Sequence, residues 1–193
     1  MRSALLLIDV QRIYTTEGSP LYVEGHETAI RNMNRLIDQA ISRGDLVVYV
    51  RHVHKSDGSD AGRMFDHLGS VSGLGFTKGT DRVALDPRLH LDPVGIHIVK
   101  NRYSAFVRTS LDYMLWARGV ERIAVTGFMT NYCCEATARH AHDLDYLVDF
   151  IIDATGCPDV SGDLKQQQVK SVVATVLQGA FARVFKTDEY LIA

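Results

Sequence analysis

The sequence predicts an α/β fold, a three-layer α/β/α sandwich around a mostly parallel, six-stranded, Rossmann-like sheet. Two observations support this prediction. Short apolar runs rich in Leu, Ile and Val alternate with longer segments of helical periodicity about five times along the chain. Several runs are apolar at nearly every position, which is typical of parallel strands that helices cover on both faces. Such an alternation builds crossover connections and places the helices in two outer layers.

Six apolar runs mark the expected strands. The first lies at residues 4–10. The second, at residues 46–50, is apolar throughout, so we expect it to be buried on both faces. The other four strands are expected at residues 96–99, 122–126, 146–152 and 182–185.

Segments of helical periodicity connect these runs. The longest covers residues 27–42, and Gly44 is its expected C-cap. Its apolar residues are predicted to share one face: Ile30, Met33, Leu36, Ile37 and Ile41. Further helices are expected at residues 109–117, 132–144 and 162–178, with Ser161 as the N-cap of the last.

The domain organisation is predicted to be simple. We find no internal repeat, low-complexity tract or Pro/Ser-rich linker, so residues 1–193 are expected to form a single domain. The polar, glycine-rich stretch at residues 55–82 is the least regular part, and loops of that length are usually functional or disordered. We expect it to form a lid or a subunit contact.

Composition and charge exclude several classes of protein. The 21 Lys and Arg residues nearly balance the 23 Asp and Glu residues, so a nucleic-acid partner or an anionic membrane surface is not expected. Asp9 and Gln11 interrupt the N-terminal apolar run, and no run approaches the length of a membrane span. Three cysteines, two of them adjacent, favour a reducing, cytoplasmic location.

Two charged residues occupy strand ends, where parallel sheets carry their sites. Asp9 closes the first apolar run and Lys100 closes the third. Each charge is costly to bury alone, and the two would compensate each other if both open onto one crevice. A structural ion pair, or a lysine in water at the rim, explains the same pattern.

Cys133 follows the fourth expected strand, at the start of a helix. Thr130 or Asn131 is a good N-cap, which places Cys133 in the first helical turn. The helix dipole and the free N–H groups of that turn favour a thiolate and could hold an oxyanion. The alternative is an inert buried cysteine, which Cys134 fits better.

Three segments together resemble the isochorismatase-like cysteine hydrolases, which include nicotinamidases, N-carbamoylsarcosine amidases, ureidoacrylate amidohydrolases and isochorismatases. These segments are LLIDVQ at residues 6–11, KNRYSAF at residues 100–106 and TGFMTNYCCEATAR at residues 126–139. Their order and spacing agree with the family across nearly the whole chain.

The resemblance implies a triad and an oxyanion hole. Cys133 would be the nucleophile, Asp9 would accept its proton and later return one, and Lys100 would hold Asp9 ionised. The family also carries a cis peptide that corresponds here to Phe128–Met129. The backbone N–H groups of Met129 and Cys133 would then point at the substrate oxygen.

Aromatic residues close to these segments are the expected substrate pocket. The predicted pocket residues are Tyr14, Tyr103, Phe106, Tyr132 and His52. Core packing is an alternative explanation for such aromatic residues. The substrate is expected to be a small molecule.

His52 and His54 alternate in a way that resembles a metal site. Nicotinamidases hold a divalent metal after the equivalent strand with an Asp and His residues, but no carboxylate accompanies Arg51 here. We therefore expect no metal and no cofactor, with one imidazole facing away and the other serving the pocket. The resemblance also implies a homo-oligomer, a dimer or tetramer, for which Leu111, Met114 and Leu115 could supply an apolar face.

Three functions follow as candidates. The first is a cysteine hydrolase that cleaves a C–N bond of a small amide or ureido compound through a thioester. The second is a vinyl-ether hydrolase of the isochorismatase type, with Asp9 as general acid. The third is a non-catalytic binding protein on the same fold.

Overall fold

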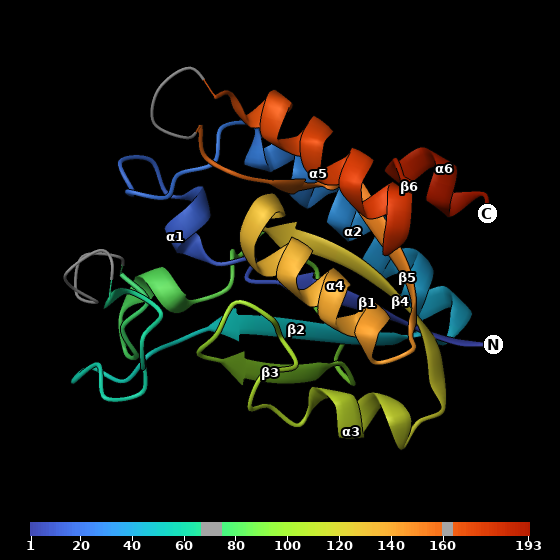
Figure 1. The fold of residues 1–193 in the computed structure, drawn as a ribbon, viewed down its shortest axis with the longest axis horizontal. Helices are drawn as coiled ribbons and strands as arrows, with labels where there is room; N and C mark the ends of the chain where they lie inside the picture. Colours follow the sequence, from blue (N-terminus) through green and yellow to red (C-terminus); the bar gives the residue numbers. More distant parts are fainter. Residues whose placement is uncertain (67–74, 160–163) are drawn as a thin grey trace.

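The computed structural model describes residues 1–66, 75–159 and 164–193. The expected N-cap Ser161 and part of the 55–82 stretch lie outside the described residues. Six strands form one sheet in the order β3-β2-β1-β4-β5-β6, and every neighbouring pair is parallel. Helices cover both faces (Figure 1). The α/β, Rossmann-like prediction is therefore confirmed.

The strands overlap the predicted apolar runs, although the first ends at Ile8 rather than at residue 10 and others are longer or shorter than expected. Their bounds are β1 (Arg2–Ile8), β2 (Leu46–His52), β3 (Ile96–Lys100), β4 (Val120–Phe128), β5 (Leu147–Gly156) and β6 (Arg183–Phe185). Strand β5 ends at Gly156 rather than residue 152, because its far end pairs with β4 at Gly127 and Phe128. Tertiary pairing therefore extends a strand beyond its apolar run.

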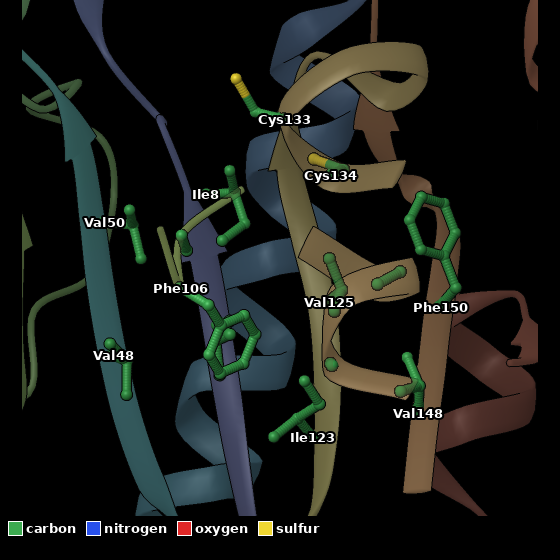
Figure 2. Packing of buried hydrophobic residues seen from close by; sticks show 14 of the residues in the cluster. Ile8, Val48, Val50, Phe106, Ile123, Val125, Cys133, Cys134, Val148 and Phe150 are labelled. Carbon is green, nitrogen blue, oxygen red and sulfur yellow. The ribbon is translucent and has the colours of Figure 1, made fainter. Parts of the chain in front are cut away.

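Two hydrophobic clusters, one on each face of the sheet, pack the helices into two layers. On one face, α3 (Leu111–Trp116), α4 (Glu135–Asp143) and α5 (Gln166–Ala180) pack against the sheet. Figure 2 shows part of this cluster, with strand residues such as Ile8, Val50 and Val125 facing the covering segments. On the other face lie α1 (Arg12–Thr15), α2 (His26–Arg43) and α6 (Thr187–Leu191).

Helix α2 confirms its predicted position and C-cap. Gly44 has a φ of 71°, a left-handed conformation that glycine adopts without cost, and it ends the helix. Ile41 was expected on the buried face but is 44% exposed. Ala40 is buried instead, because the helical repeat of 3.6 residues aligns it with Met33 and Ile37.

Helix α3 corrects the expected oligomer face. Leu111 and Leu115 are fully buried in the core of the chain itself, so they are not free to contact a second subunit. The exposed apolar side chains of this helix are Tyr113 and Trp116, at 69% and 72% exposure. The pattern of apolar residues located the helix, but its apolar face packs on the core of the same chain and not on a second subunit.

The order of the strands determines where a site can form. Strands β1 and β4 are adjacent at the centre, and the chain leaves β1 toward β2 and leaves β4 toward β5. Such a switch point opens a crevice beyond the carboxyl ends of the strands. Among the described residues, no helix is both long and apolar enough to cross a membrane.

Candidate active site

Asp9 leaves the carboxyl end of β1 in a left-handed turn. Its φ is 50°, which is uncommon for a residue with a side chain, and its N–H donates to the carbonyl of Val50 at 2.9 Å. Gly127 of β4 lies directly beside this turn. A Cβ on Gly127 would lie 2.0 Å from the carbonyl oxygen of Ile8, so only glycine lets β4 approach β1 this closely.

Lys100 joins the other two residues of the predicted triad. Its ammonium nitrogen lies 2.7 Å from Oδ2 of Asp9 and 3.2 Å from Sγ of Cys133. It also donates to the carbonyl of Arg102 at 3.0 Å. These three partners match the three N–H groups of an ammonium, so the buried charge is held in one orientation. The structure thus brings Asp9, Lys100 and Cys133 into contact from the ends of three different strands.

The segment before Cys133 differs from the expected capped helix. Residues Thr130–Cys134 form a π-helical turn that leads into α4, and Met129 occupies the N-cap position without a side-chain hydrogen bond. The expected N-cap Thr130 instead donates its hydroxyl to Thr155 of β5 at 2.9 Å. Neither Thr130 nor Asn131 is therefore the cap. The Phe128–Met129 peptide is cis, as the resemblance implied.

Burial controls the protonation of the triad. It raises the pKa of the Cys133 thiol to about 12, although the Lys100 ammonium acts in the opposite direction. Burial also raises the pKa of Asp9 against the effect of Lys100. Burial outweighs the Lys100 ammonium, so the surroundings expected to favour a thiolate do not lower the pKa of Cys133.

A cavity of about 300 Å³ opens beside Cys133, at the lower end of volumes usual for small-molecule sites. Its walls are mainly aromatic and apolar. The lining residues are Tyr14, Pro20, Leu21, His52, Met64, Phe65, Phe76, Tyr103, Met129, Asn131, Tyr132, Cys133, Pro158 and Asp159. Four of the five predicted pocket residues, Tyr14, Tyr103, Tyr132 and His52, are among them.

Known proteins are similar to this chain in sequence and in architecture. A protein-family model described as "Isochorismatase domain" matches residues 3–189. The chain belongs to the isochorismatase family. It is accordingly an isochorismatase-like hydrolase.

Relatives and solved structures agree with this assignment. The ureidoacrylate amidohydrolase RutB of Rhizobium rhizogenes is 29% identical over 171 residues, which cover 79% of this chain and 70% of RutB. A "probable inactive nicotinamidase" of Arabidopsis thaliana is 35% identical over 156 residues, which cover 79% of this chain and 80% of the relative. The crystal structure of a cysteine hydrolase from Pseudomonas syringae pv. phaseolicola is similar with a TM-score of 0.90 at 30% identity, covering 99% of this chain and 91% of that one.

Phe106 does not line the cavity of this isochorismatase-family chain, contrary to the prediction. Its ring lies in the core, 5.4 Å from the ring of His140 and 6.0 Å from that of Tyr146. Figure 2 shows Phe106 well below Cys133, among the strand residues of the buried cluster. The side chain of Phe106 points into the core. Its closeness to Lys100 in the sequence does not reveal this direction.

His52 and His54 contact each other, so the expectation that one faces away is wrong. Their Nε2 atoms are 2.8 Å apart, because side chains two residues apart project from the same side of an extended chain. Nδ1 of His54 lies 3.2 Å from Oδ1 of Asp60. Gln11 holds this end of β2: its Oε1 accepts from the His52 N–H at 2.8 Å, and its Nε2 donates to the His52 carbonyl.

Asp9, His52 and Cys133 also have the donor types of a zinc site. One donor atom from each lies within 4.8 Å of the others. The Lys100 ammonium, however, touches both Asp9 and Cys133. A second cation in contact with the same two groups would be repelled at close range, so these residues do not fit a metal.

Sequence reasoning missed several cavity residues of this family member. Met64, Phe65 and Phe76 come from the irregular 55–82 stretch, where no periodicity marks a wall residue. Asn131 was considered only as a cap, yet it lines the cavity, and its Oδ1 is buried without a hydrogen-bond partner among the described residues. Asp60 could have been suspected as an acidic residue shortly after the two histidines.

Proposed function

We propose that this protein is a cysteine hydrolase that cleaves a C–N bond of a small amide or ureido compound through a thioester on Cys133. The observation that carries the proposal is the position of the Lys100 ammonium, 2.7 Å from the Asp9 carboxylate and 3.2 Å from the Cys133 sulfur. The names of the relatives, an amidohydrolase and a cysteine hydrolase, support it.

In the first half of the reaction, Asp9 acts as the base. Its carboxylate lies within 4.8 Å of the Cys133 sulfur, and its Oδ1 has no hydrogen-bond partner among the described residues. It accepts the thiol proton as sulfur attacks the substrate carbonyl, and Lys100 stabilises the negative charge while it moves. Collapse of the tetrahedral intermediate breaks the C–N bond. Asp9 gives its proton to the departing nitrogen.

The developing oxyanion requires donors beside the sulfur. Met129 and Cys133 both line the cavity; Met129 precedes the π-helical turn and Cys133 lies within it. We assign their backbone N–H groups to this role, since N–H groups at such a turn are directed outward and already fixed in place. Water then attacks the thioester and releases the acid and the free thiol.

The cavity favours a small, partly unsaturated substrate. Tyr14, Phe76, Tyr103 and Tyr132 supply aromatic surface on which a planar group can stack. The unpartnered Oδ1 of Asn131 offers an acceptor for an N–H of an amide or ureido group.

Activity measurements on a substrate panel test the proposal. Wild-type protein is incubated with small primary amides, ureido compounds and isochorismate, and ammonia or amine release is measured. We expect turnover of at least one amide or ureido compound, and a loss of at least about a thousandfold in Cys133→Ser. Intact-mass spectra of the wild type should show an acyl group on Cys133.

Cys134 provides the matched control. It is the adjacent cysteine, equally buried, but its sulfur is directed to the backbone carbonyl of Thr126. Cys134→Ser should therefore stay close to wild-type activity. Turnover of isochorismate alone, retained in Cys133→Ser, would favour the vinyl-ether hydrolase. A wild type without any turnover, whose Cys133 resists thiol reagents, would favour a binding protein.

A homo-oligomer and a cytoplasmic location are also proposals. The exposed rings of Tyr113 and Trp116 on α3 are a candidate contact surface. Light scattering after size-exclusion chromatography tests the first, and Trp116→Ser should reduce the mass if this surface is used. The three free cysteines favour a reducing compartment.

A further inference from the structure

A chain of hydrogen bonds beside the triad links two imidazoles and a carboxylate. His52 at the end of β2 contacts His54, and His54 contacts Asp60, with distances of 2.8 and 3.2 Å. The ring of His52 is buried and stacks on Phe76, with centroids 4.4 Å apart. The proposed acid–base steps at Asp9 and Cys133 use none of these contacts.

The network determines which nitrogen of each ring carries a proton. Burial works against ionisation of Asp60, but hydrogen bonds from the Lys55 N–H, Asn101 and His54 outweigh it and lower its pKa. A carboxylate only accepts, so Nδ1 of His54 must be protonated. Burial lowers the pKa of both histidines, so each ring is neutral with one proton. His54 then accepts at Nε2, His52 donates from Nε2, and Nδ1 of His52 is left as an acceptor.

The ring of His52 lies close to the reacting atoms. One ring nitrogen of His52 is within 4.8 Å of a carboxylate oxygen of Asp9 and of the Cys133 sulfur. Nε2 of His52 contacts His54, so we assign Nδ1 to the side of the triad. A water molecule that donates two hydrogen bonds of about 2.8 Å joins acceptors roughly 4.5 Å apart. The separation of Asp9 and His52, at most 4.8 Å, is compatible with such a water.

We propose that His52 positions the water that hydrolyses the Cys133 thioester, and that His54 and Asp60 act through it by holding its Nδ1 unprotonated. The proposal rests on the proposed function. The water donates one hydrogen bond to Nδ1 of His52 and the other to Asp9. Its oxygen attacks the acyl carbon, its proton passes to Asp9, and the C–S bond breaks. Asp9 then returns the proton to the Cys133 sulfur. His52 keeps its own proton throughout.

The test separates acylation from deacylation with 4-nitrophenyl acetate as an activated acyl donor. Release of nitrophenolate in the first turnover reports attack by Cys133, and the steady-state rate reports hydrolysis of the acetyl-enzyme. In His52→Leu we expect near wild-type first-turnover release and a steady-state rate lower by about a hundredfold. Acetylated Cys133 should accumulate in intact-mass spectra, and added hydroxylamine should restore turnover because it attacks without the positioned water.

Two further variants distinguish positioning from packing. His52→Asn places an amide oxygen near the former Nδ1 and should recover part of the steady-state rate, although it loses the same contact to His54 as His52→Leu. His54→Phe keeps an apolar ring beside Phe65, removes the acceptor for His52, and should accumulate acetyl-enzyme to a smaller extent. If His52→Leu does not fold, His54→Phe provides the test in its place.

Two results would overturn the inference. If first-turnover and steady-state rates fall together in the His52 and His54 variants, while Cys133 still acquires the acetyl group, His52 does not position water but the proposed function stands. If the wild type and every variant hydrolyse the acyl donor without an adduct on Cys133, the proposed function and the role of His52 fail together.

Discussion

The ammonium of Lys100 lies 2.7 Å from the carboxylate of Asp9, and both side chains are completely shielded from solvent. Each ion is expensive to bury, and each is tolerated because the other is present. The pair holds a charged acid–base group beside a neutral thiol, inside a wall of apolar residues. Stability and the proposed chemistry therefore depend on the same contact.

Removing one member of this pair should unfold the protein more easily than removing both. Lys100→Met leaves an uncompensated carboxylate and should lower the free energy of unfolding by about 3–5 kcal/mol. Asp9→Asn combined with Lys100→Met should recover part of that loss. Urea unfolding of the two single variants and the double variant at neutral pH measures the coupling. Strict additivity would show that the two groups do not compensate each other.

The close approach of β4 to β1 requires glycine at position 127. Gly127→Ala puts a methyl group against the Ile8 carbonyl at a φ of 110°, and should destabilise the fold by about 3 kcal/mol or more. Gly179 in α5 is the control, because nothing lies within 4 Å of the position of its Cβ. Gly179→Ala should stabilise the helix by up to about 1 kcal/mol. Equal denaturant midpoints for Gly127→Ala and Gly179→Ala would contradict this explanation.

The cavity wall and the core should respond differently to truncation. Phe106→Ala removes a buried ring and should cost about 3–5 kcal/mol of unfolding free energy, with little change in KM. Tyr132 lines the cavity and is 44% exposed, so Tyr132→Ala should raise KM and change stability by less than about 1 kcal/mol. Kinetics on a substrate found in the amide panel, together with thermal unfolding, compares the two. A raised KM in Phe106→Ala alone would reverse the assignment.

Asp86 should contribute an acid-sensitive part of the stability. Burial opposes its ionisation, but hydrogen bonds from Arg88 outweigh burial and lower its pKa to about 2. A folded-state pKa below the ordinary value of 3.8 means that the charged form stabilises the fold above about pH 4, and that this contribution is lost as pH falls toward about 2. Asp86→Asn should be less stable than wild type at neutral pH. The difference should shrink over that acidic interval in urea unfolding curves, and a constant difference would reject the explanation.

Several features could be read from the sequence because their physical causes are local. An apolar run such as residues 46–50 is removed from water only in a strand that is covered on both faces. Gly44 indicates a helix end because glycine readily adopts the left-handed conformation found there. Parallel strands all end at one edge of a sheet, so Asp9 and Lys100 could be expected to approach each other there. Three separate segments in a shared order were enough to indicate the family.

Other features depend on which surfaces meet, and the sequence alone did not determine them. Phe106 follows Lys100 closely but turns into the core, and Leu111 packs inward rather than toward a partner. The raised pKa of Cys133 comes from the loss of water around it, which outweighs the Lys100 ammonium. The pairing of His52 with His54 and Asp60 exists only once β2 and the following loop are folded. The order of apolar and polar residues therefore determined the sheet and the edge that carries the site, while tertiary packing decided solvation and side-chain direction, because both depend on neighbours distant in the chain.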